Sequence, residues 1–168
     1  QPAWPAELAA RAAREATAGR VPQALVAAAI AFEVALAVRA RTTLELDFDR
    51  LSESDLAKLP RNTAKEARQF APGVFRLEGA QRRSEALAAV DPAYAHWHAD
   101  RRRDALLNRR NFLVHRAKAP TQDEAAEAFS FLDEMFRALG WPVPSACPSA
   151  PNSIAALVAA LRPAAGLQ

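Results

Sequence analysis

Cysteine, tyrosine and glycine are scarce in this chain, which has one, one and five of them among its 168 residues. The single cysteine, Cys147, cannot form an intrachain disulfide, so the fold must depend on packing and suits a reducing compartment. We therefore expect a cytoplasmic protein. The few glycines form no glycine-rich loop that could hold phosphates, which argues against a nucleotide hydrolase.

The sequence also lacks a secretory signal, because no basic region is followed by an uninterrupted apolar run and a cleavage site. The most apolar stretch, 24–38, holds Glu33 near its middle and is too short to span a bilayer. We expect a buried helix there and no membrane partner. Because the first residue is Gln1 and not Met, we expect a trimmed chain or one domain of a longer protein.

Alanine is the abundant residue and fills 42 of the 168 positions. Alanine is the best helix former, and no alternation of apolar and polar residues indicates a sheet. We predict an all-α protein, a bundle of about five or six helices. Residues 1–140 should form this helical domain, and residues 141–168 a Pro/Ser-rich linker with a short helix near 154–161.

Caps and turn residues predict where the helices begin and end. The expected helices cover about 5–18, 22–41, a short stretch after Ser52 or Ser54, 62–70, 79–90, 92–119 and 121–139. The helix from Pro92 should be continuous, because Asp91 and Pro92 form a strong helix start and no breaker precedes Pro120. Thr121 and Glu124 fit a capping box for an acidic amphipathic helix, with inward residues Phe129, Leu132, Met135 and Phe136.

Positive charge is concentrated in one segment. Residues 101–118 have seven basic side chains and one acidic side chain, a net charge of +6, whereas the rest of the chain has 15 basic and 18 acidic residues, a net −3. The total of +3 is too small to indicate a polyanionic partner. Its concentration in one helix is the more informative feature.

Residues 110–115 of this segment read Arg-Asn-Phe-Leu-Val-His, so four residues separate Arg110 from His115 and Asn111 directly follows the arginine. This pattern lies towards the end of a long predicted helix, before another helix. It resembles the signature of the HEPN superfamily, helical bundles of which many are metal-independent ribonucleases. The resemblance implies a HEPN-like bundle that forms a symmetric dimer and needs no cofactor.

Helical spacing adds a geometric constraint. Asn111 and His115 are four residues apart and lie roughly 40° from each other, so the amide can orient the imidazole. Arg110 and His115 are five residues apart and lie about 140° from each other. Either the helix loosens between them, or Arg110 reaches around it, or a second copy of the chain completes the site.

The implied reaction is RNA cleavage by the RNA's own 2′-hydroxyl, giving 2′,3′-cyclic phosphate and 5′-hydroxyl ends. His115 would transfer protons, Arg110 would stabilise charge on the phosphate oxygens and Asn111 would orient the imidazole. No metal takes part. The predicted RNA-binding residues are Arg101, Arg102, Arg103, Arg109, Arg116 and Lys118.

Two other groups of residues invite a chemical interpretation. Glu33 is costly to bury unpaired, so we expect it to pair with an arginine of the long helix. A more specific form of this prediction is that Glu33 orients Arg110. His96, His98 and Asp100 look like a metal cluster, but residues two apart on a helix point about 200° apart, so we expect no metal site.

HEPN domains typically serve toxin–antitoxin systems, abortive infection or CRISPR-associated defence, so the resemblance implies a toxin or antiviral defence effector. Its partner would be an antitoxin or a regulatory domain. Many toxin members have a tyrosine two positions after the histidine, which a partner nucleotidyltransferase modifies, but this chain has Ala117 there. Arg116 stands where small residues are common. Control by that modification is therefore not expected.

Two alternatives stay open. The domain could be a catalytically silent HEPN-like module that binds RNA or a protein, or a structural module whose basic helix docks on an acidic surface. The arginines could also pair inside the chain with the acidic connection 45–55 or with the acidic helix, whose carboxylates are Asp123, Glu124, Glu127, Asp133 and Glu134. Tyr94 and Trp97 could stack on bases, although core packing is the more common role of such aromatics.

Overall fold

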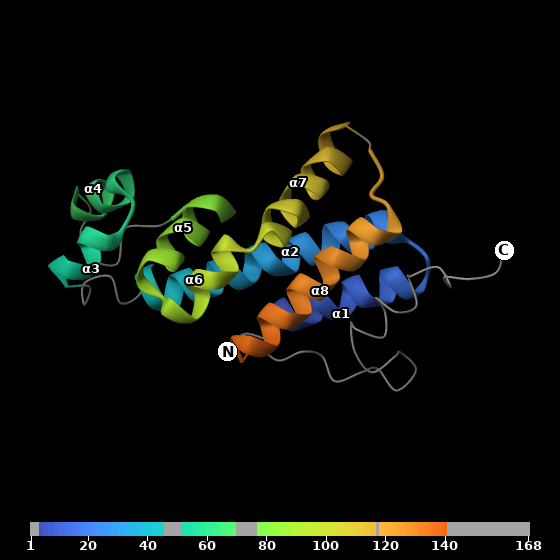
Figure 1. Ribbon diagram of the computed structural model, residues 1–168, viewed down its shortest axis with the longest axis horizontal. Coiled ribbons are helices and arrows are strands. Elements are labelled where there is room, and N and C mark those ends of the chain that lie inside the picture. Colours follow the sequence, from blue (N-terminus) through green and yellow to red (C-terminus); the bar gives the residue numbers. More distant parts are fainter. Residues whose placement is uncertain (1–3, 46–51, 70–76, 117, 141–168) are drawn as a thin grey trace. The chain divides into compact units, whose positions relative to one another are not determined.

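The computed structural model describes residues 4–45, 52–69, 77–116 and 118–140. Within these ranges the chain forms eight α-helices and one short π-helix, and no strand (Figure 1). The all-α prediction is confirmed, with more helices than the five or six expected. The predicted linker and short helix at 141–168 lie outside the described residues, as do most of the acidic connection and Ala117.

The helices are α1 (Trp4–Thr17), α2 (Val21–Ala40), α3 (Glu53–Lys58), α4 (Arg61–Gln69), α5 (Ala80–Val90), α6 (Pro92–Ala99), α7 (Arg101–Arg116) and α8 (Gln122–Ala138), with the π-helix Arg41–Glu45 directly after α2. The chain divides into two compact units. The first combines residues up to Phe32 with those from Asp100 onwards, and the second comprises Glu33–Ala99. The motif helix α7 belongs to the first unit.

The continuous helix predicted over 92–119 is wrong, because α6 ends at Ala99 and α7 begins at Arg101. Asp100 interrupts it by capping α7. Its side chain accepts a hydrogen bond from the Arg102 amide at 2.9 Å, and its carbonyl accepts one from the Arg103 amide at 3.1 Å. An aspartate that binds these free amides competes with continuation of the helix.

Helix α2 is longer than its most apolar stretch suggested. Together with part of the π-helix it spans Val21–Leu44, 24 residues with a mean hydropathy of 2.0, which is long and apolar enough to cross a membrane by length and composition. The prediction that the segment is too short is therefore wrong. However, 56% of this apolar window is buried inside the protein, as in a core helix.

Aromatic packing builds the core of the first unit. Phe32 of α2 meets Phe131 of α8 edge to face, with ring centroids 5.8 Å apart. The predicted capping box of Thr121 and Glu124 is present at the start of α8. The four residues predicted to face inward on this helix are all buried, which confirms its amphipathic pattern: Phe129, Leu132, Met135 and Phe136.

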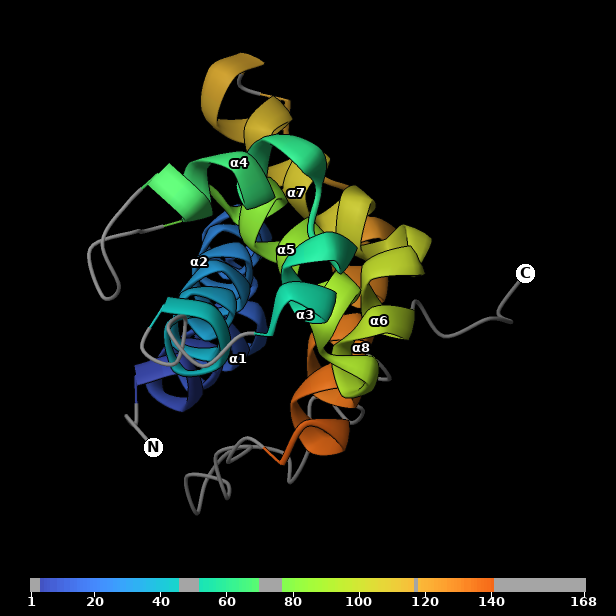
Figure 2. The ribbon, with the colours of Figure 1, turned by 90° about the vertical axis from the view of Figure 1, so that its left-hand side faces the viewer.

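In the second unit, α3 contacts both α4 and α5, and α5 contacts α6 (Figure 2). Ser84 of α5 lies 2.6 Å from the Tyr94 hydroxyl and 2.8 Å from Nδ1 of His98, both on α6. Arg39 forms an ion pair with Asp91, the residue before α6. Tyr94 and Trp97 are buried, so these aromatics pack in the core of this unit.

Candidate functional site on helix α7

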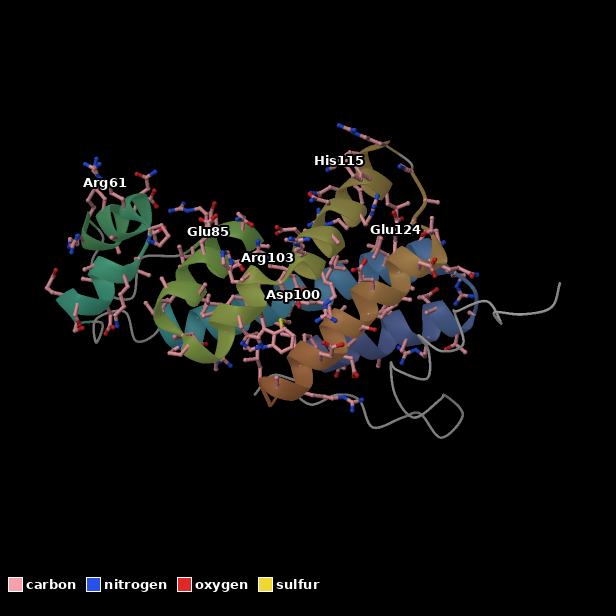
Figure 3. The ribbon with its side chains drawn as sticks, viewed as in Figure 1. Arg61, Glu85, Asp100, Arg103, His115 and Glu124 are labelled. Carbon is pink, nitrogen blue, oxygen red and sulfur yellow. The ribbon has the colours of Figure 1, made fainter. Side chains whose placement is uncertain are left out.

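The motif lies on an uninterrupted α-helix, because α7 runs from Arg101 to Arg116 without a break. The first explanation for the spacing of Arg110 and His115, a loosened helix between them, is therefore wrong. Their directions from the axis of α7 differ by about 140°. Arg110 is partly buried, whereas His115 is exposed in the last turn of α7 (Figure 3).

Asn111 and His115 share the exposed face of α7, one helical turn apart. An exposed imidazole can exchange protons with a bound substrate, and an amide one turn away can hold it in one orientation. Val114, between them in the sequence, is 56% exposed and places one apolar side chain on the surface at this end of the helix.

Arg102 is held by two carboxylates. Its Nη1 and Nη2 donate to Glu134 of α8 at 3.0 and 2.8 Å, and Nη2 also donates to Asp100 at 2.7 Å. These bonds, the one to Glu134 first, raise the pKa of Arg102 well above its ordinary value. The guanidinium also lies 5.7 Å from the centre of the Phe131 ring. Arg102 is thus part of the contact between α7 and α8.

Two more of the predicted RNA-binding arginines are engaged within the protein. Arg109 pairs with Glu124 of α8 at 2.6 Å. Arg103 is only 5% exposed and pairs with Asp104 at 2.5 Å. The alternative in which arginines pair with the acidic helix is therefore confirmed for Arg102 and Arg109.

The other three predicted RNA-binding residues, Arg101, Arg116 and Lys118, are exposed. The Arg116 guanidinium lies 5.1 Å from the centre of the Phe112 ring, a cation–π distance. The Lys118 amide donates to the Phe112 carbonyl at 3.3 Å, which folds the chain back at the end of α7. Two exposed cations, Arg116 and Lys118, therefore follow His115 closely in the sequence.

Two of the other predictions, the pairing of Glu33 and the absence of a metal site, stay predictions. Glu33 is partly buried on α2, and its contact with Arg110 stays a prediction. Among the described residues, no group of three or more His, Cys, Asp or Glu side chains could hold a metal ion. His96 is exposed, and His98 is partly buried against Ser84, so the two rings lie in different environments.

Sequence reasoning missed an apolar groove in the first unit, with a volume of about 340 Å³. Leu8 of α1, Val26 and Ile30 of α2 and Leu113 of α7 line it, together with the charged residues Arg11 and Glu15 of α1. Ile30 is 41% exposed. The available signal was α2 itself, which is apolar on nearly every side and so needs more cover than its neighbours give.

Leu113 connects this groove to the motif. It follows Arg110 by three residues and lies on the same side of α7, about 60° from it, whereas His115 lies about 160° from Leu113. The groove and the exposed histidine are therefore on different sides of one helix.

The comparisons with known proteins add no assignment. No family model matches the chain, and neither curated proteins nor solved structures give a match. The resemblance to the HEPN superfamily thus depends on residues 110–115 and the helices around them, and it stays a prediction.

Proposed function

We propose that this protein is a metal-independent endoribonuclease of the HEPN type that works as a symmetric dimer. One observation supports this most directly. Asn111 and His115 stand exposed on one face of a continuous helix, with Arg110 directly before Asn111. These are the side chains that the reaction needs, in an order that resembles the family motif.

In the proposed reaction, His115 accepts the proton of the RNA 2′-hydroxyl while this oxygen forms a bond to the adjacent phosphorus. The bond from phosphorus to the 5′-oxygen breaks, and that oxygen receives a proton from the imidazolium that His115 has become. Arg110 binds the non-bridging oxygens, where negative charge accumulates. The products are a 2′,3′-cyclic phosphate and a 5′-hydroxyl. DNA has no 2′-hydroxyl and is not cleaved.

The angle between the two residues supports the proposed dimer. Because Arg110 and His115 diverge by about 140° on one regular helix, a two-fold pair of α7 helices would let Arg110 of one protomer and the partner's His115 meet at one phosphate. Such a contact would also cover the exposed apolar side chain of Val114, beside the motif.

Affinity for RNA is assigned mainly to the exposed cations Arg101, Arg116 and Lys118, because Arg102 and Arg109 already bind carboxylates. A role as a cytoplasmic toxin or defence effector, held in check by an antitoxin or a regulatory domain, belongs to the same proposal.

The test is to incubate the purified chain with labelled RNA in EDTA and to analyse the product ends. We expect cleavage with 2′,3′-cyclic phosphate ends, lost in Arg110→Ala and in His115→Ala. Matched controls are His96→Ala and Arg137→Ala, which replace exposed residues away from the motif. If either motif variant cuts RNA as fast as the parent, the site assignment is wrong.

A catalytically silent domain that binds RNA or a protein is the second candidate. The ion pairs of Arg102, Arg103 and Arg109 favour it, because a basic helix that is partly neutralised within its own fold has a structural role. Salt-sensitive RNA binding without products in the same assay would select this candidate. If the protein neither binds nor cleaves RNA in this assay, the result would favour the purely structural module.

A further inference from the structure

The groove between α1, α2 and Leu113 presents apolar side chains that the described residues leave uncovered. Leu8, Val26 and Leu113 are partly buried, and Ile30 is exposed. Apolar side chains that stay accessible in a groove are stabilised when another segment covers them. All of these residues belong to the first unit.

The sequence itself contains a segment of matching character. Residues 154–161 read Ile-Ala-Ala-Leu-Val-Ala-Ala-Leu, so the larger apolar residues recur at the first, fourth, fifth and eighth positions. This spacing is typical of a helix with one apolar stripe, and alanines fill the remaining positions. Ser153 before it is a favourable cap, and Pro163 is a favourable stop. Such a helix is stabilised when its apolar stripe packs against an apolar surface.

The length of the connecting chain allows this segment to reach the groove. The pairs of Arg102 with Glu134 and of Arg109 with Glu124 show that α7 and α8 run side by side in opposite directions (Figure 1). Leu113 therefore lies level with the start of α8. The end of α8 is about 26 Å away along the helix axis, which is the length of its 17 residues. Residues 141–153 can span about 43 Å when extended.

We propose that residues 153–162 form an amphipathic helix that docks into this groove of the same chain. Ile154, Leu157 and Leu161 would contact the side chains that line it. The docked helix would support the side of α7 that bears Leu113 and Arg110. It would leave Asn111 and His115 open, because they lie on another side of α7.

The test uses disulfide trapping in the full chain with Cys147→Ser as background. We expect Ile30→Cys combined with Leu157→Cys to form an intramolecular disulfide rapidly in dilute, mildly oxidising solution. The control pair is Glu127→Cys with Leu157→Cys, because Glu127 is exposed on α8 and does not line the groove. Equal rates for the two pairs would overturn the proposal, and so would a disulfide formed only between two chains, which assigns the groove to a second copy.

Hydrogen exchange gives a second readout that does not depend on new cysteines. In the parent chain we expect amides in 154–161 to be protected, with protection lost in Leu157→Asp but kept in Ala156→Ser. The same Leu157→Asp change should speed exchange in α2 around Ile30. Unprotected amides in 154–161 of the parent chain would overturn the proposal and leave the groove to another protein. Neither measurement involves RNA, so failure here is distinct from failure of the proposed function.

Discussion

Arg102 of α7 and Glu134 of α8 are joined by two hydrogen bonds, of 3.0 and 2.8 Å, in a forked arrangement. Two parallel bonds of this kind are stronger and more directional than a single surface ion pair. Farther along the same helices, Arg109 pairs with Glu124. The acidic helix α8 therefore orients α7 and also takes up part of the positive charge of the motif helix.

Releasing this arginine should change how the protein binds RNA. In Glu134→Gln, Arg102 loses one of the two carboxylates that hold it and keeps Asp100, so its guanidinium becomes more available to phosphate. We expect tighter binding, and the logarithm of the binding constant should fall more steeply with log salt, by up to about 0.7 in slope. The cost in the free energy of unfolding should stay under about 1 kcal/mol, since Glu134 is half exposed. The measurement is an RNA-binding titration at several salt concentrations.

The control is Glu127→Gln, which removes an equal charge from an exposed position of α8. It should leave the salt slope close to that of the parent. An identical slope in Glu134→Gln and in the parent would mean that Arg102 does not contribute to RNA binding even when it is released.

The cap at the start of α7 should matter for stability. We expect Asp100→Ala to lower the free energy of unfolding by about 1 kcal/mol, because the Arg102 amide loses its acceptor. Asp100→Asn should keep more of the stability than Asp100→Ala, since asparagine caps as well, and should lose the contribution of the ion pair between Asp100 and the Arg102 guanidinium. Denaturant titration followed by circular dichroism measures both. Equal stability of Asp100→Ala and the parent would show that the break between α6 and α7 does not depend on this cap.

Acid should weaken the pairing of Glu15 with Arg20, at the end of α1. The hydrogen bond from Arg20 holds the pKa of Glu15 below its ordinary value, more than burial raises it. The contribution of the pair is therefore fully present above the ordinary pKa of about 4.3 and is lost as the pH falls through the lowered pKa.

We expect the melting temperature of the parent to decrease as the pH is lowered from about 5 to about 2. Arg20→Ala should reduce this pH dependence slightly. Thermal melts across this range measure the effect. Arg61→Ala, which removes an exposed arginine of the other unit, should follow the parent. A steeper acid dependence in Arg20→Ala than in the parent would contradict the expected direction of the effect.

Local signals predicted α8 well. Thr121 and Glu124 form the expected capping box, and the apolar spacing placed Phe129 and Phe136 inward, because a helix with a strong cap and a clear stripe needs little tertiary information. The break at Asp100 was missed for the opposite reason. No proline or glycine marks it, and an aspartate inside a helical run is equally consistent with an exposed position.

The sequence by itself determined that the protein is helical, because alanine content and helical periodicity act within single turns of the chain. It also determined that positive charge and the residues of the motif share one segment. Only the tertiary structure decided which arginines are already paired, that Arg110 is partly buried while His115 is exposed, and that Leu113 lines a groove. These features arise where α7 contacts α8 and where side chains of α1, α2 and α7 line one groove. Contacts between segments that are distant in the sequence cannot be predicted from the periodicity of any single segment.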